Sequence, residues 1–174
     1  FVSLQNSDIR IDMGDPPLAK VIVGGKEYAI KQVISSDMGD AELDGLSALR
    51  EATPNVPEAY GAAVEDGQYF IILDYIDRAT LQDSNSIYNT MKSVYSKTGE
   101  YWGWHRNNFV GSLIQENSRF EGFLDYFMQS RIEPLLRLTY NSGMIERSFK
   151  EKIISLISKK SNEWELGKII PRLI

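Results

Sequence analysis

Residues 19–34, "AKVIVGGKEYAIKQVI", decide how the first part of the chain folds. Two runs rich in apolar residues flank Gly24-Gly25, and a glycine pair in that setting is a strong signal for a β-hairpin. Because side chains alternate across a strand, Lys31 should share one face with Ala29 and Val33. The sequence therefore predicts a hairpin that places a lysine on one face with two apolar neighbours.

A short helix is predicted next, over residues 40–53, with Asp40 as its N-cap. Glu42 would share a helical face with Leu46 and so point toward the core, where a carboxylate is costly unless it is paired. Lys31 is the candidate partner. A strand lysine paired with a helix glutamate orients phosphates in protein-kinase-like folds, although two separate solvated charges would fit the same pattern.

The remaining segments divide into strands followed by helices. Residues 1–11 alternate loosely, and residues 56–77 read as a second strand pair turned at Glu65-Asp66-Gly67. Helices are predicted over residues 84–97, 120–139 and 144–160. Pro134 should kink or end the second of these, because an interior proline costs roughly 3 kcal/mol. The order predicts an α+β fold, with a sheet lobe at 1–78 and a partial helical lobe at 79–174.

Composition excludes several classes of function. The chain has 174 residues, a net charge of −5 and a pI of about 5.0, so it lacks the basic footprint of a nucleic-acid-binding protein. One His and no Cys leave almost no route to a structural zinc site, although carboxylates could hold a hard cation. No apolar run is long enough to span a membrane. Absence of cysteine fits a reducing cytoplasm, and a start at Phe1 suggests a processed or trimmed piece.

Two further segments would suit a nucleotide site. "DMGDPPLAKV" (12–21) stands before the strand pair, and backbone N–H groups near Gly14 and Asp15 could approach phosphate oxygens. "FIILDYID" (70–77) is an apolar strand that runs into a polar end, as a hinge beside an adenine base does. A plain turn and an ordinary strand explain these two segments equally well.

The stretch "YWGWHRNNFVGSLIQEN" (101–117) places Trp102 and Trp104 beside His105, the only histidine. The tryptophans are expected to pack or to line a cleft. The polar groups that follow could contact a polyhydroxylated ligand or satisfy the backbone of the loop. Taken alone, the segment leaves a structural and a ligand-binding role for His105 both open.

The spacing of this stretch resembles the fructosamine kinase (ketosamine 3-kinase) family. The matching positions are Gly103-Trp104-His105, Asn108, Gly111, Gln115, Asn117 and Arg131-Ile132-Glu133-Pro134-Leu135-Leu136. The upstream segments "YAIK" and "DAELDGLSAL" agree, so the resemblance spans essentially all 174 residues. The resemblance implies a bilobal fold similar to protein kinases and aminoglycoside phosphotransferases. It also implies ATP- and Mg²⁺-dependent phosphorylation of the 3-hydroxyl of ketosamines, small or protein-bound, as a deglycation step.

Roles for individual residues follow from the same resemblance. Lys31 would orient the ATP phosphates and Glu42 would hold it. The loop at Gly14 and Asp15 would cover the nucleotide, although Met13-Gly14 stands where the family has two glycines, and Asp74, Tyr75 and Ile76 would form the hinge. The acceptor side would include Trp104, His105, Asn108 and Gln115.

No catalytic residue or metal ligand is assigned within the chain. "GKIIPRLI" (167–174) resembles the strand that leads into the family's catalytic loop, so the catalytic Asp and the Mg²⁺ ligands are expected after Ile174. Two alternatives stay open. The chain could be a non-catalytic kinase-like binding module, or a kinase for another hydroxylated small molecule such as an aminoglycoside or choline. The sequence does not set the oligomeric state, and it points to no nucleic-acid or membrane partner.

Overall fold

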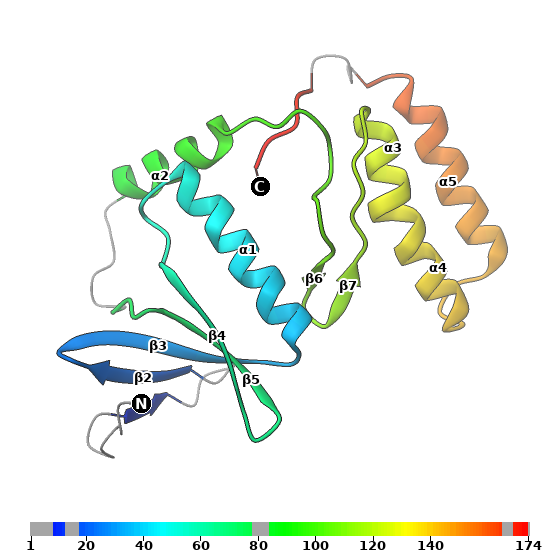
Figure 1. Cartoon of the computed structure of the whole chain (residues 1–174). Helices are drawn as coiled ribbons and strands as arrows, with labels where there is room; N and C mark the ends of the chain where they lie inside the picture. Colours follow the sequence, from blue (N-terminus) through cyan, green and yellow to red (C-terminus); the bar gives the residue numbers. More distant parts are fainter. Residues whose placement is uncertain (1–8, 13–17, 78–83, 165–168, 174) are drawn as a thin grey trace. The chain divides into compact units, whose positions relative to one another are not determined.

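The computed structural model describes residues 9–12, 18–77, 84–164 and 169–173, with backbone alone for 9–12. The chain divides into two compact units, residues 1–97 with 174 and residues 98–173, and each is described by itself (Figure 1). The predicted lobe boundary between residues 78 and 79 lies outside the described residues. The helix that follows it, α2 (Ser84–Ser96), groups with the first unit.

The first unit is built on a five-stranded antiparallel sheet in the order β1-β2-β3-β5-β4. Its strands are β1 (Ile9–Asp12), β2 (Leu18–Val23), β3 (Lys26–Val33), β4 (Ala59–Glu65) and β5 (Gln68–Asp74). Both predicted hairpins are confirmed. Their two-residue loops have positive φ at both positions, 60° and 80° at Gly24-Gly25 and 48° and 75° at Asp66-Gly67, as the twist of paired strands favours.

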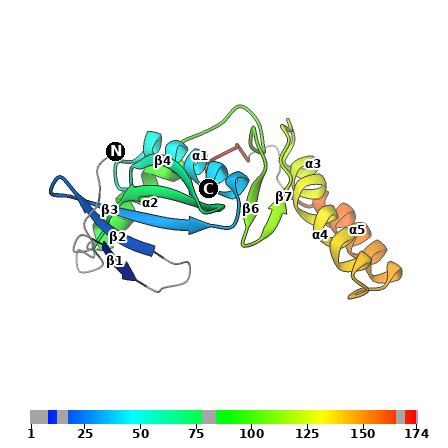
Figure 2. The same ribbon diagram turned by 60° about the horizontal axis from the view of Figure 1, so that its bottom comes forward.

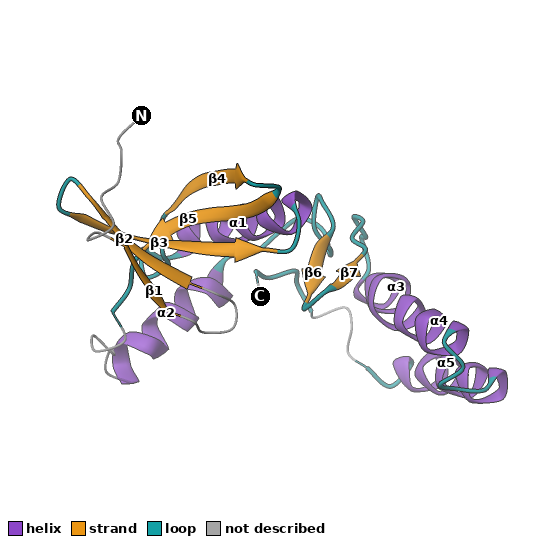
Figure 3. Cartoon of the chain, turned by 90° about the horizontal axis from the view of Figure 1, so that it is seen from below, coloured by secondary structure: helices purple, strands orange, loops and turns teal. Residues whose placement is uncertain are grey.

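Helix α1 (Ser36–Ala52) packs on the face of β3, β4 and β5 (Figures 1 and 3). The core beneath it consists of Ala29, Val33, Ile71 and Leu73, with Leu43 and Leu46 of the helix packed against them. Gly39 allows the close approach. A Cβ there would lie 3.3 Å from Val33 Cγ2 and 3.4 Å from Ile71 Cγ2, which is tighter than ordinary contact.

The predicted N-cap of α1 is wrong. The helix begins at Ser36, and the Ser35 side chain caps it by accepting a hydrogen bond from Met38 N–H at 3.3 Å. Asp40 lies inside the helix. The sequence interpretation started the helix near its first apolar repeat, whereas serine at position 35 and Asp37 in the first turn already satisfy the helix N-terminus.

The second unit combines a small hairpin with helices. The hairpin pairs β6 (Asn108–Val110) with β7 (Leu113–Gln115), and the sequence did not predict it because strands of three residues show no alternation. The helical part is α3 (Phe123–Phe127), a π-helical turn (Met128–Ile132), α4 (Glu133–Asn141) and α5 (Arg147–Ser161). Figures 1 and 2 show α4 and α5 side by side.

Pro134 interrupts the predicted helix of residues 120–139, as expected, but the chain continues through a wider turn. Glu133 N–H donates to the carbonyl of Met128, five residues back, and Pro134 stands in the first turn of α4. A proline has no N–H and its ring crowds the preceding turn, so a π-helical turn here accommodates both defects.

A cluster of half-buried aromatic rings packs together in the second unit. The Trp102 ring lies 4.9 Å from Phe123 and 5.9 Å from Tyr126, between ring centroids, so Trp102 is a packing residue. Its backbone exchanges hydrogen bonds of 2.8 and 2.9 Å with Phe120. The next residue, Gly103, has a φ of +100°, and a Cβ there would lie 1.9 Å from Ser118 O.

Candidate functional site

Lys31 and Glu42 form a close ion pair between β3 and α1. Lys31 Nζ lies 2.6 Å from Glu42 Oε1 and 2.7 Å from Oε2, and the two side chains are 25% and 32% exposed. In the sheet register Lys31 pairs with Leu18 on one side and Ile71 on the other, so its stem leaves the strand among apolar neighbours. The predicted pair is confirmed, and two separate solvated charges are excluded.

The ion pair with Glu42 engages two of the three donors of the Lys31 ammonium. Among the residues that the structure describes, none accepts the third. The ammonium is therefore fixed in position by the carboxylate and can still donate to an anionic oxygen.

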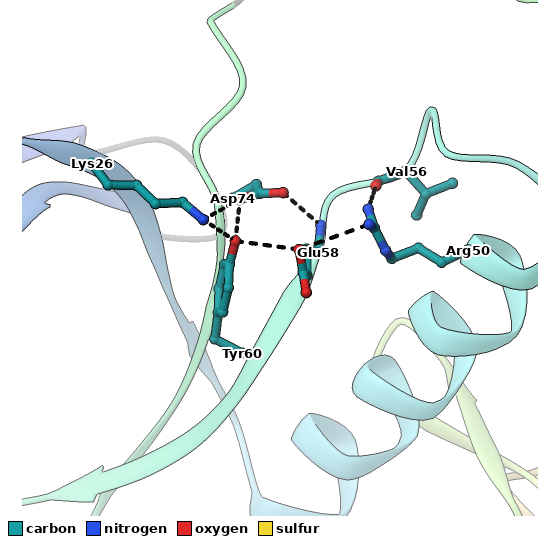
Figure 4. Close-up of polar contacts among 6 residues, drawn as sticks. All are labelled: Lys26, Arg50, Val56, Glu58, Tyr60 and Asp74. Atoms are coloured by element: carbon teal, nitrogen blue, oxygen red, sulfur yellow. Dashed lines mark hydrogen bonds and ion pairs between the residues drawn. The ribbon is translucent and has the colours of Figure 1, made fainter.

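The end of β5 is held by a chain of polar contacts, which Figure 4 shows. Tyr60 Oη donates to Asp74 Oδ1 at 2.6 Å, and Glu58 N–H donates to Asp74 Oδ2 at 3.0 Å. Lys26 Nζ donates to Tyr60 Oη and lies 3.7 Å from Asp74 Oδ1. The Tyr60 hydroxyl, the Glu58 N–H and the Lys26 ammonium together lower the pKa of the Asp74 carboxyl.

This network changes what the predicted hinge can offer. Asp74 N–H donates to Glu58 O at 2.9 Å, and the Asp74 carboxylate is taken by Tyr60 and Glu58. Asp74 therefore anchors the strand end through both its carboxylate and its N–H. The predicted phosphate-loop residues Gly14 and Asp15 lie outside the described residues.

The structure brings Asn108 and Gln115 together in the second unit. They face each other in the register of β6 and β7, and Asn117 Nδ2 donates to Asn108 Oδ1 at 3.0 Å. Arg131 Nη2 donates to Asn117 Oδ1 at 2.8 Å. With its amide oriented to satisfy its neighbours, Gln115 Oε1 accepts from the same Nη2 at 2.8 Å. Three amide side chains, Asn108, Gln115 and Asn117, thus form one cluster with Arg131.

Trp104 and His105 lie at the start of the same segment. Their rings are 4.9 Å apart between centroids and tilted by 42°, with Trp104 partly buried and His105 exposed. The sequence-based prediction included Asn117 and Arg131 only as parts of a motif and gave them no role in the site. An arginine three residues before a proline could have indicated a structural role for Arg131, because an interior proline leaves one helix carbonyl without its usual N–H donor.

A model of the fructosamine kinase family matches residues 21–173. The chain belongs to this family. Among curated proteins, it is 24% identical over 135 residues to a probable ketoamine kinase of Enterococcus faecium, an alignment that covers 78% of this chain and 48% of the relative. The chain thus spans about half the length of the curated relative.

Solved structures of the family share the fold. A candidate fructosamine-3-kinase of Thermobifida fusca superposes with a TM-score of 0.74 at 15% identity, over 98% of this chain and 60% of that chain. A second candidate fructosamine-3-kinase, from Haemophilus somnus, superposes with a TM-score of 0.69 at 18% identity, over 98% of this chain and 56% of that chain. The predicted kinase-like α+β fold is confirmed over the part that this chain shares with these fructosamine kinases.

The fructosamine kinase family is a kinase family, which implies the use of ATP. Lys31, with its third donor, fits a nucleotide phosphate. A hard divalent cation needs several oxygen ligands, and the described residues bring together no group of three or more His, Asp or Glu side chains. Within the same residues, no helix is long and apolar enough to cross a membrane.

Proposed function

We propose that the natural protein containing this chain is an ATP-dependent kinase that phosphorylates the 3-hydroxyl of ketosamines and so acts in deglycation. Membership of the fructosamine kinase family supports the reaction class. The single observation that carries the assignment is the Lys31–Glu42 pair, because both carboxylate oxygens hold the ammonium at 2.6–2.7 Å and leave one donor directed elsewhere.

In this function Lys31 donates its third N–H to a phosphate oxygen of ATP, while Glu42 keeps the ammonium from moving. Phosphoryl transfer depends on positioning and on stabilising charge on the phosphate oxygens, and a cation held in place costs no reorganisation during reaction. ATP, when bound, supplies the phosphoryl group. The described residues offer no Mg²⁺ cage, so no step is assigned to ligands for this ion.

The nucleotide base would lie against the chain after β5. The backbone groups of Tyr75 and Ile76 are the proposed contacts, and the Asp74 network holds the strand end that presents them. The loop containing Gly14 and Asp15 would cover the phosphates. These contacts belong to the proposed nucleotide lobe, residues 1–78.

The acceptor would contact the second unit, within the proposed helical lobe of residues 79–174. Trp104 and His105 offer an aromatic surface on which a sugar ring can lie, and Asn108 and Gln115 offer amide groups for its hydroxyl oxygens. A chain without cysteine suits the reducing cytoplasm, where ATP is available, and this is the proposed location.

The test uses the natural protein with ATP, Mg²⁺ and a fructosyl-amine, with ADP release and the phosphorylated acceptor both measured. We expect Lys31→Met to lower kcat/KM by about 10²–10³, the scale on which a positioned charge-stabilising group acts. Lys160→Met is the matched control, since Lys160 also pairs with a glutamate, Glu163, at 2.9 Å, on the exposed surface of the second unit.

Each alternative function predicts a different result. A wild-type protein that binds ATP but phosphorylates no hydroxylated acceptor would be a binding module. Transfer to an aminoglycoside or to choline, but not to the fructosyl-amine, would refute the substrate. Full activity in Lys31→Met would refute the role of the ion pair.

A further inference from the structure

Arg131 uses every donor that its guanidinium has. Nη1 donates to Ser130 O at 2.9 Å and lies 3.4 Å from Glu116 O. Nη2 donates to Asn117 Oδ1 at 2.8 Å and to Gln115 Oε1 at 2.8 Å, and Nε lies 3.3 Å from the same Gln115 oxygen. All of these acceptors are neutral, so Arg131 is fixed inside the fold and has no N–H left for an anionic ligand.

The contact with Ser130 explains why the arginine stands where it does. In a regular helix the Ser130 carbonyl would accept from the N–H of residue 134, and Pro134 has none. Ser130 is only 6% exposed, and an unsatisfied buried carbonyl is costly. Arg131 Nη1 satisfies this carbonyl, and the Tyr126 ring, 4.6 Å from Cζ, covers the guanidinium.

The fixed guanidinium also decides how the neighbouring amides are turned. The oxygens of Gln115 and Asn117 face Arg131, because N–H groups there would meet other donors. Asn117 Nδ2 then donates to Asn108 Oδ1, which uses the third amide oxygen. The Gln115 amide also lies 3.3 Å from Asn108 Oδ1, where only an N–H of Gln115 can donate. The NH₂ group of Asn108 and the second N–H of Gln115 are what remain for a ligand.

We infer that Arg131 is a positioning residue, which orients the amides of Asn108 and Gln115 so that the β6–β7 hairpin offers N–H donors to oxygen atoms of the acceptor. The inference rests on the proposed function for its substrate. The chemistry it selects is a hydroxyl or carbonyl oxygen of a polyol. An ammonium group at the same place would meet donors only.

The first test compares two arginines of the same helical run in the natural protein. Arg131→Lys keeps the charge and removes the planar fork, whereas Arg137→Lys alters an exposed residue whose guanidinium is 3.7 Å from Glu116 Oε2. We expect Arg131→Lys to raise KM for the fructosyl-amine at least about tenfold, the scale of one lost charge-assisted hydrogen bond, with KM for ATP unchanged. Arg137→Lys should change neither.

Nuclear magnetic resonance of the side-chain groups tests the geometry without activity. The Nε–H of Arg131 and the NH₂ group of Asn117, which donates to Arg106 O and Asn108 Oδ1, should exchange slowly with solvent in the wild type. The Asn117 NH₂ group should exchange faster in Arg131→Lys. A second variant, Asn117→Asp, keeps an oxygen for Arg131 and removes the donor that orients Asn108. It should raise the acceptor KM while the Arg131 Nε–H stays protected.

The outcomes separate the two proposals. If side-chain amide exchange is the same in Arg131→Lys and wild type, Arg131 does not hold the amides in place. If exchange is faster but the acceptor KM is unchanged, the positioning role is refuted. An increase in KM for ATP equal to that for the acceptor would indicate general loss of structure and also refute it. A wild type that does not phosphorylate ketosamines would refute the proposed substrate. The exchange rates would still show whether Arg131 holds the amides in place.

Discussion

Replacing Gly103 by alanine should destabilise the second unit selectively. The new Cβ would lie 1.9 Å from Ser118 O, and real Cβ atoms essentially never approach within 3.0 Å. The carbonyl belongs to backbone that cannot rotate away as a side chain would, so the two segments must separate by about 1 Å. That separation acts directly on the two hydrogen bonds between Trp102 and Phe120.

The cost can be estimated from its parts. Two weakened backbone hydrogen bonds contribute about 1 kcal/mol each, and a non-glycine residue at positive φ adds about 1–2 kcal/mol. The total is about 3–4 kcal/mol of unfolding free energy. Gly111→Ala is the control, because Gly111 also has a positive φ, +60°, but a Cβ there meets nothing within 4 Å. Gly111→Ala should cost only the strain, about 1–2 kcal/mol.

Tryptophan fluorescence during urea denaturation measures this effect in the right part of the chain. All three tryptophans, Trp102, Trp104 and Trp164, lie in the second unit, so their signal reports on that unit. The midpoint should fall strongly for Gly103→Ala and slightly for Gly111→Ala. Equal shifts in the two variants would show that the clash with Ser118 does not determine the effect.

Two further predictions concern the strand end and the helix surface. Because the pKa of the Asp74 carboxyl is lowered in the fold, its contribution is complete above its ordinary pKa and is lost as pH falls through the lower folded value. Amide exchange at Glu58 should therefore be faster in Asp74→Asn than in wild type at neutral pH, with the difference shrinking in acid; a constant difference would contradict this. The isolated 174-residue chain should also associate, because apolar patches on α4 and α5 promote contact between molecules. Sedimentation should detect oligomers, and a monomer that melts cooperatively would argue against it. Exposed side chains there include Leu135 (53%), Leu138 (48%), Phe149 (50%) and Leu156 (52%).

The parts of the fold that the sequence predicted well are those with a local cause. A glycine pair between apolar runs can adopt one kind of turn cheaply, so the hairpin at Gly24-Gly25 could be located from residue types alone. The Lys31–Glu42 pair was predictable because strand alternation and helix periodicity independently turned both charges toward the same apolar layer. Each of these inferences needed only the neighbouring residues.

The rest depended on contacts that no local pattern shows. The hairpin of β6 and β7 is too short to alternate and is held by Arg131, which comes from a helix 16 residues later than Gln115. Asp74 was predicted as part of a hinge, yet its carboxylate and N–H are taken up by Tyr60 and Glu58 from the neighbouring strand segment. Sequence spacing cannot reveal which polar groups a neighbour has already engaged.

The π-helical turn at Met128–Ile132 makes the number of residues here matter as much as their identity. Such a turn amounts to one residue inserted into an α-helix, and each residue rotates the following side chains by about 100° around the axis. A deletion between Phe127 and Arg131 would leave a more regular helix but would turn Arg131 away from the amides. In an alignment of relatives, a one-position gap in this segment should therefore mark proteins in which the acceptor side is built differently, even where every motif residue is retained.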